Sequence, residues 1–181
     1  RDERGDRFVS LSDDTTHDIL PNRYTLFLDV IRHYKPSGTI VETGTWNGGR
    51  AIQIAMACFE HTDTLHYIGY DLFEDATLET DEEEFNVKPH NRKSAVEQRL
   101  TDFANIMLKR RSKYFTFELI KGNTRQTISK TNADLVLIGG GNSLTTVKNE
   151  YKHLKHNKLI IFDNFFMEDK TERNVSEKFQ G

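Results

Sequence analysis

The sequence is poor in cysteine, since Cys58 is the only one among 181 residues. A single cysteine excludes an internal disulfide and a cysteine-rich metal site, and the apolar run at residues 54–59 predicts a buried, unreactive thiol. No apolar stretch approaches the roughly 18 residues of a transmembrane helix. The polar start at residues 1–4 does not resemble a signal peptide. We therefore expect a soluble, cytoplasmic protein with no membrane partner.

An excess of positive charge is also missing, because 25 Lys and Arg stand against 28 Asp and Glu, for a net charge of -3. Without a basic excess the chain has no general attraction for phosphate backbones, so we expect no nucleic-acid partner. Hydrophobic residues make up only 36% of the chain, and the shortage lies in two polar segments. We predict a polar N-terminal arm at 1–20 and a single domain at 21–181 with a mobile loop at 74–93. That loop is either a lid over a ligand pocket or a solvated loop beside a basic helix.

Short apolar or alternating runs predict five strands, at residues 39–43, 67–71, 115–119, 135–138 and 159–162. Helical spacing separates them, with a helix face at 24–31, a helix at about 49–59 and a capping box at 94–97 that opens another helix. This alternation predicts an α/β fold, in which helices cover both faces of an open, mainly parallel, Rossmann-like sheet. Ligands of such sheets bind beyond the carboxyl ends of the strands.

The turn after the first strand is rich in glycine, and residues 42–49 read Glu-Thr-Gly-Thr-Trp-Asn-Gly-Gly. Gly44 and Gly48 let the backbone turn sharply, and the amide groups that open the next helix offer a polar cradle. The dinucleotide fingerprint has a glycine where this chain has Trp46, which disfavours a nicotinamide-binding dehydrogenase. A turn that needs glycine for its geometry alone is the other interpretation.

Polar residues follow the other strands as well. Asp71 ends the second strand, where a carboxylate accepts hydrogen bonds from a ribose diol or is simply solvated. Asn123 and Thr124 follow the third strand, and their side chains either reach an adenine edge or cap the next helix. The fourth strand leads into residues 139–142 and the fifth ends in Asp163, which Asn164 follows.

Together these strand ends resemble class I S-adenosylmethionine-dependent methyltransferases over roughly residues 24–166. Within that superfamily they are most similar to small-molecule O-methyltransferases of the macrocin and catechol types, and the segment 42–49 is the most specific part. The resemblance implies methyl transfer from S-adenosylmethionine to a hydroxyl of a small molecule or sugar. It also implies a cofactor site made of Glu42, Gly44, Thr45, Trp46, Asn47, Gly48, Asp71, Leu72, Asn123, Thr124 and Gly139. Glu42 and the glycine turn would hold the methionine end, Asp71 the ribose, and Asn123 with Thr124 the adenine region.

The chain departs from this family at the site of a divalent metal. In the relatives the fourth strand ends in Asp, and it binds the cation together with an Asp-Asn or Asp-Asp pair after the fifth strand. Asp163 and Asn164 match that pair, whereas Gly139 replaces the first carboxylate. Loss of one oxygen ligand weakens a site for a hard cation in both charge and geometry. We therefore expect little dependence on Mg²⁺.

The family's catalytic base is missing too, because Asn142 stands where relatives have His or Lys, and an amide accepts no proton near neutral pH. Two interpretations stay open. In the first, Asn142 and Asp163 line the acceptor pocket, and Asp163, His17 or His90 accepts the proton. In the second, the chain binds the cofactor but is catalytically silent or serves another reaction.

The family fold usually closes with an antiparallel hairpin after the fifth strand, where this chain has a polar tail at 167–181. The hairpin is absent, supplied by a partner, or outside the sequence shown. An uncovered edge strand favours pairing, so a homo-oligomer is one prediction.

Overall fold

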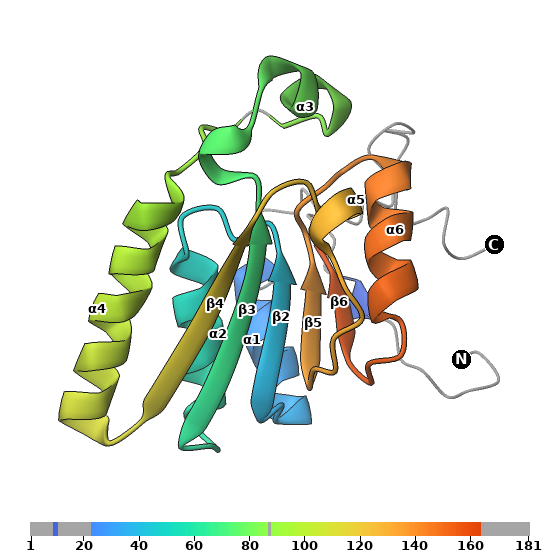
Figure 1. Cartoon of the computed structure of the whole chain (residues 1–181). Helices are drawn as coiled ribbons and strands as arrows, with labels where there is room; N and C mark the ends of the chain where they lie inside the picture. The colour runs from blue at the N-terminus through green and yellow to red at the C-terminus, as the bar shows by residue number, and fades with distance from the viewer. Residues whose placement is uncertain (1–8, 11–22, 87, 164–181) are drawn as a thin grey trace, which may run out of the picture.

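The computed structural model describes residues 9–10, 23–86 and 88–163, and its strands form one six-stranded sheet (Figure 1). In chain order the elements are β1 (Val9–Ser10), α1 (Arg23–Tyr34), β2 (Gly38–Thr43), α2 (Gly49–Cys58), β3 (Thr64–Asp71), the 3-10 helix η1 (Phe73–Asp75), α3 (Leu78–Glu83), α4 (Lys93–Arg111), β4 (Tyr114–Lys121), α5 (Thr124–Thr127), β5 (Leu135–Ile138), α6 (Leu144–Leu154) and β6 (Ile160–Phe162). The strand order is β1-β6-β5-β2-β3-β4, and all paired neighbours are parallel.

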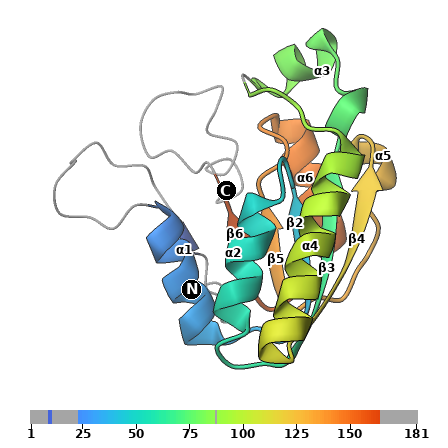
Figure 2. The ribbon, with the colours of Figure 1, turned by 90° about the vertical axis from the view of Figure 1, so that its left-hand side faces the viewer.

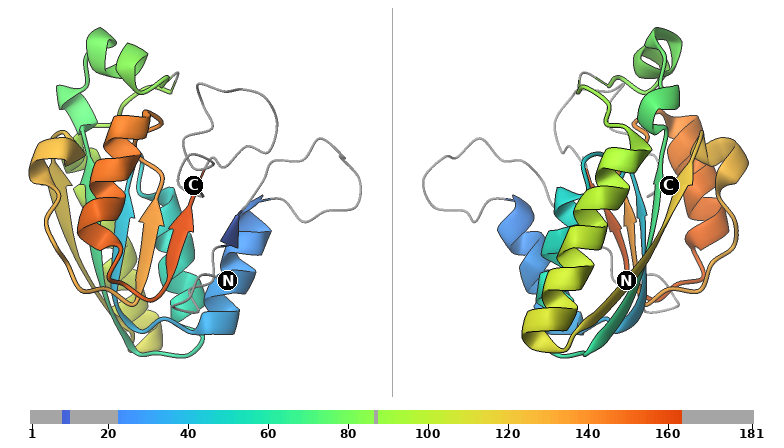
Figure 3. Two further views of the ribbon diagram at one scale, coloured as in Figure 1. Left: turned by 90° about the vertical axis from the view of Figure 1, so that its right-hand side faces the viewer. Right: turned by 60° about the vertical axis from the view of Figure 1, so that its left-hand side comes forward.

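The alternation of side chains along the strands divides the core into two layers. Ile40 and Leu137 point to a cluster that includes α1, α2 and α4, and Figure 2 shows these three helices on one face of the sheet. Val41 and Val136 point to the opposite cluster, which includes α6, and the left view in Figure 3 shows α6 on that face. The predicted open parallel sheet with helices on both faces is confirmed.

Strand order reverses between β2 and β5, and this reversal positions the site. From β2 the chain moves outward to β3 and β4, then returns to the other side of β2 to form β5 and β6. The turns that follow β2 and β5 are in close contact, since a Cβ on Gly44 would lie 2.5 Å from the Cα of Gly140. Ligands of open α/β sheets bind at such a switch point.

The start of α4 differs from its prediction. The expected capping box at Ser94 is wrong, because the helix begins at Lys93 and no side chain of its N-cap residue, Arg92, caps it. The backbone N–H of Lys93 donates instead to Glu74 Oε2 at 2.7 Å. A carboxylate from η1, 19 residues earlier, therefore satisfies the first amide of the helix.

Two segments that the composition marked as polar contribute regular structure. Residues 9–10 of the predicted arm form β1, which pairs in parallel with β6, so the edge that we expected to be uncovered is partly paired. The 74–93 segment contains α3, whose first turn is stabilised by a capping box between Thr77 and Thr80. Residues 1–8, 11–22 and 164–181, which include His17 and Asn164, lie outside the described part of the chain.

Cys58 is buried in α2, as predicted, and burial raises the pKa of its thiol to about 12, which disfavours the reactive thiolate. Among the described helices, none has both the length and the apolar character needed to cross a membrane.

Candidate functional site

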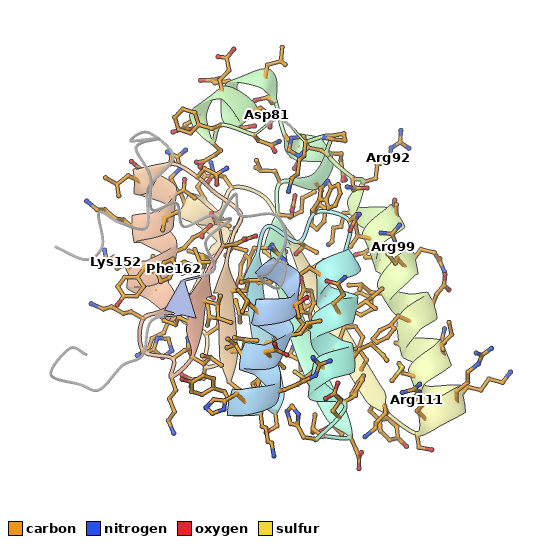
Figure 4. All side chains as sticks on the ribbon, turned by 180° about the vertical axis from the view of Figure 1, so that it is seen from behind. Asp81, Arg92, Arg99, Arg111, Lys152 and Phe162 are labelled. Carbon is orange, nitrogen blue, oxygen red and sulfur yellow. The ribbon has the colours of Figure 1, made fainter. Side chains whose placement is uncertain are left out.

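A cavity of about 490 Å³ opens at the carboxyl edge of the sheet, beside the 74–93 segment. Asp81, on the α3 side of the cavity, lies beyond the strand ends in Figure 4. Nine of the eleven residues predicted to bind the cofactor line this cavity: Gly44, Thr45, Trp46, Asn47, Asp71, Leu72, Asn123, Thr124 and Gly139. The two predicted catalytic residues, Asn142 and Asp163, line it as well. Residues far apart in the sequence thus meet at one site.

Two predicted cofactor residues, Glu42 and Gly48, lie behind the lining. Glu42 is fully buried, and burial raises the pKa of its carboxyl against the opposing effect of Arg50. Gly48 has a φ of 75°, and a Cβ there would lie 3.0 Å from Val96 Cγ1 on α4. Gly48 therefore allows α4 to approach the turn. Glu42 does not reach the cavity itself and instead positions Arg50, which lines it.

Arg50, which sequence reasoning missed, is the centre of an ion-pair network under the cavity. Its Nε donates to Glu42, its Nη1 donates to Asp163, and its Nη2 lies 3.2 Å from the carbonyl oxygen of Gly44. The hydroxyl of Tyr67 also donates to Glu42. The network ties the end of β2 to the end of β6. The signal in the sequence was a basic residue directly after the glycine turn.

Asp71 is held at the cavity wall by backbone amides. Its Oδ2 accepts a hydrogen bond from the N–H of Trp46 at 2.7 Å, and its Oδ1 accepts one from the N–H of Phe73 at 2.8 Å. Hydrogen bonds from backbone amides orient a carboxylate without neutralising it. The predicted ribose-binding residue is thus preorganised on the lining.

The amide groups of the glycine turn already have acceptors inside the protein. Gly44 and Thr45 donate to the carbonyl of Tyr70, Trp46 donates to Asp71, Gly48 donates to the carbonyl of Thr45, and Gly49 donates to the side chain of Asn47. These five amides are therefore engaged within the protein, and Gly49 is the one among them that belongs to α2, whose first amides we expected to form a cradle. A pyrophosphate would have to compete with the existing acceptors, which is a further argument against a dinucleotide.

The 74–93 segment contacts the other walls of the cavity at two places, in addition to its ion pairs with Lys121 and Arg125. Trp46 Nε1 donates to the carbonyl oxygen of Pro89 at 2.9 Å, and Lys88 Nζ lies 5.4 Å from the centre of the Trp46 ring. At the other place, Glu84 Oε2 accepts hydrogen bonds from the N–H groups of Asn142 and Ser143 at 2.9 and 2.8 Å. The segment therefore closes one side of the cavity.

Glu84 caps the N-terminal end of α6, because its carboxylate also accepts from the hydroxyls of Ser143 and Thr146. Negative charge is favourable at a helix N-terminus. The side-chain amide of Asn142 donates to the backbone carbonyl of Glu84 at 2.9 Å, so this predicted catalytic residue contacts the 74–93 segment. Sequence reasoning gave the 74–93 loop only as a lid or a solvated loop and missed the role of Glu84.

Glu150 on α6 is a second acidic residue that sequence reasoning missed. It is fully buried and accepts hydrogen bonds from Thr43 at 2.9 Å and Thr124 at 2.7 Å. The hydroxyl of Thr43 in turn accepts the amides of Gly139 and Gly140 at 3.1 and 3.3 Å. Burial raises the pKa of Glu150 to about 7. This carboxyl group joins the ends of β2, β4 and β5.

The predicted adenine-region residues and the predicted bases also have partners. Asn123 caps α5 by accepting the N–H of Arg125 at 2.9 Å, so the capping interpretation holds while the residue still lines the cavity. His90 lines the cavity too, and its Nε2 lies 2.7 Å from Asp81 Oδ1. The described residues contain no group of three His, Cys, Asp or Glu that could hold a metal ion.

The lining of the cavity carries more carboxylates than cationic side chains, and Arg125, which lies outside the lining, pairs with two of them, Glu83 and Glu84. Two cationic side chains, Arg50 and Lys88, face five carboxylates among the described residues of the lining: Asp71, Asp81, Glu83, Glu84 and Asp163. Such a lining attracts a cationic ligand and repels a strongly anionic one.

Neither a protein-family model nor a curated protein matches the chain, whereas several solved structures do. A Staphylococcus aureus protein described as a caffeoyl-CoA O-methyltransferase is 14% identical, with a TM-score of 0.52, over 88% of this chain and 71% of its own. A Klebsiella pneumoniae protein described as an O-methyltransferase is 15% identical, with a TM-score of 0.47, over 91% and 69%. The O-methyltransferase TomG of Streptomyces achromogenes, in complex with S-adenosylmethionine, is 15% identical, with a TM-score of 0.45, over 91% and 69%. The likeness to the S. aureus structure shows that the chain has the Rossmann-like fold of class I methyltransferases.

Proposed function

We propose that this chain binds S-adenosylmethionine and transfers its methyl group to a hydroxyl of a small molecule or sugar. One observation carries the proposal: Asp71, oriented by two backbone amides, lies on an acidic cavity at the switch point of the sheet. Two carboxylate oxygens held in this way can accept hydrogen bonds from both hydroxyls of a ribose. The subtype of O-methyltransferase belongs to the same proposal and rests on the resemblance of residues 42–49.

Charge favours this cofactor over a dinucleotide. S-adenosylmethionine carries a sulfonium and an ammonium group against one carboxylate, whereas the pyrophosphate of a dinucleotide is anionic. The excess of carboxylates on the lining therefore attracts the former and repels the latter. The amides of the glycine turn also disfavour a dinucleotide, because they already donate to acceptors such as the carbonyl of Tyr70. A phosphate would have to displace these acceptors to bind there.

The residues around the cavity can bind and orient the two reactants. When bound, S-adenosylmethionine supplies an electrophilic methyl group. Asp71 would hold its ribose, Asn123 and Thr124 would lie near its adenine, and the 74–93 segment would exclude water. The acceptor hydroxyl would lie near Asn142 and Asp163, and orientation at short range would account for most of the acceleration. Its proton would pass to Asp163 or to His90, both of which line the cavity.

A second candidate function is a catalytically silent cofactor-binding protein. Its support is the side chain of Asn142, which accepts no proton near neutral pH, and the ion pair between Asp163 and Arg50, which would have to open before the carboxylate accepts one. In this interpretation the cavity binds the same cofactor and no acceptor reacts.

A transfer assay distinguishes these two functions. Incubation with methyl-labelled S-adenosylmethionine and a panel of catechols, sugars and other hydroxyl compounds should label at least one acceptor. Asp71→Asn should reduce the labelling, and Asp63→Asn should not, because Asp63 is exposed and pairs with Lys113 at the opposite end of β3. If cofactor binding is normal and no compound in the panel is labelled, the silent-binder function is the better description.

A further inference from the structure

The guanidinium of Arg50 lies at the ends of β2, β5 and β6, where it contacts two carboxylates and one carbonyl group. Its side chain is 17% exposed, and those of its partners Glu42 and Asp163 are 0% and 12% exposed. Arginine does not lose its proton in proteins, so this group is a permanent cation. The two carboxylates beside this permanent cation balance its charge within the protein.

Gly139 leaves the space that this cation needs. A Cβ at position 139 would lie 3.2 Å from Nη2 of Arg50 and 3.1 Å from the Cβ of Asp163. Gly139 is not among the glycines with positive φ, so its backbone conformation does not require glycine. A side chain at 139 would therefore press against the guanidinium and Asp163, which would have to shift by a few tenths of an ångström.

We propose that the guanidinium of Arg50 takes the place of a divalent metal ion at this edge, and that the protein works without one. Mg²⁺ requires near-octahedral coordination by oxygen ligands at about 2.0–2.1 Å. The carboxylate of Asp163 instead accepts a hydrogen bond from Nη1 of Arg50, and the guanidinium would repel a divalent cation bound at this carboxylate. The residues that the structure describes here do not fit a metal site.

The charge of Arg50 would also act on the acceptor, a step that rests on the proposed function. Arg50 lines the cavity beside Asn142 and Asp163, where the acceptor hydroxyl would lie. A guanidinium N–H group directed at that place can stabilise an oxygen that becomes negative as its proton leaves, although the two carboxylates that pair with Arg50 offset part of its charge. Arg50 would thus supply the electrostatic part of what a metal ion supplies at such sites.

Titration with Mn²⁺, followed by electron paramagnetic resonance on the full chain without cofactor, tests the metal part of the proposal. Wild-type protein and Asp163→Asn should show the same weak binding or none. Stoichiometric Mn²⁺ binding by the wild type that falls at least tenfold in Asp163→Asn would overturn it. The measurement needs neither cofactor nor acceptor, so failure to bind S-adenosylmethionine would contradict the proposed function and leave this result standing.

A variant designed to gain a site tests the part assigned to Arg50 and Gly139. Glu42→Gln/Arg50→Gln/Gly139→Asp removes the buried ion pair as a unit and adds a second carboxylate beside Asp163. If it folds by circular dichroism, it should bind Mn²⁺ at least tenfold more tightly than the wild type, whereas Gly139→Asp alone should not. A folded variant with no gain would contradict the replacement of a metal by Arg50. If the triple variant is unfolded, the Mn²⁺ titration of the wild type and Asp163→Asn alone tests the proposal.

Discussion

Replacement of Arg50 by Met should lower the free energy of unfolding by about 3–5 kcal/mol, because removal of one partner leaves a buried charge without compensation. Glu42 has no exposed surface, and Arg50 is the cation that pairs with it. Arg50 also holds Asp163 at the end of β6. Denaturant unfolding followed by circular dichroism measures the effect. Arg50→Lys should have a smaller effect, since it keeps the charge but loses the planar guanidinium that reaches several acceptors.

Arg32→Met is the matched control for this experiment. Arg32 pairs with Glu60, and their side chains are 45% and 50% exposed. An exposed ion pair contributes little to stability because water and salt screen it, so this variant should remain close to the wild type. Equal losses of stability in Arg50→Met and Arg32→Met would show that the buried network does not stabilise the fold as described.

Replacement of Glu150 by Gln should change how stability depends on pH. Burial raises the pKa of this carboxyl in the folded protein from its ordinary value of 4.5 to about 7. Between these values the folded protein keeps the proton and the unfolded chain loses it, so wild-type stability falls as pH rises through this range. Gln cannot titrate, and its amide oxygen can accept from one of the two threonine hydroxyls while its amide nitrogen only donates, so any hydrogen bond lost in the variant is lost at every pH. Between pH 5 and pH 8 the variant should therefore gain on the order of 2–3 kcal/mol relative to the wild type.

Denaturant unfolding at several pH values tests this expectation. The sign is specific, because a carboxylate that is stabilised by a salt bridge would produce the opposite change. Glu97→Gln is the control, since Glu97 is an exposed residue on α4 whose side chain is 46% exposed. Parallel stability profiles of the wild type and Glu150→Gln would contradict a neutral buried carboxyl at the junction of β2, β4 and β5.

The strands and the glycine turn could be predicted from the sequence because their signals are local. The apolar run at 135–138 has the length of a buried parallel strand and is too short for a helix. The order of strands and helices then determines which turns reach the carboxyl edge. For this reason the residues after β2, β3, β4 and β5 could be assigned to one site before their positions were known.

The contacts that shape the site could not be predicted, because they join residues far apart in the sequence. Arg50 and Asp163 are separated by 113 positions, and Glu84 and Asn142 by 58. Each of these pairs depends on the packing of whole elements and leaves no periodic pattern. The wrong capping box at Ser94 has a similar cause, since a tertiary hydrogen bond from Lys93 to Glu74 satisfies the helix start in place of a local one.

Calorimetric titration with S-adenosylhomocysteine tests the central claim most directly. The wild type and Asp63→Asn should bind one equivalent with the same affinity, and NAD should not compete. Asp71→Asn should weaken binding roughly 10- to 100-fold, which corresponds to the loss of about 1.5–3 kcal/mol from hydrogen bonds to a charged group. Absence of binding by the wild type, or equal affinity in Asp71→Asn, would contradict a cofactor site at the carboxyl edge of this sheet.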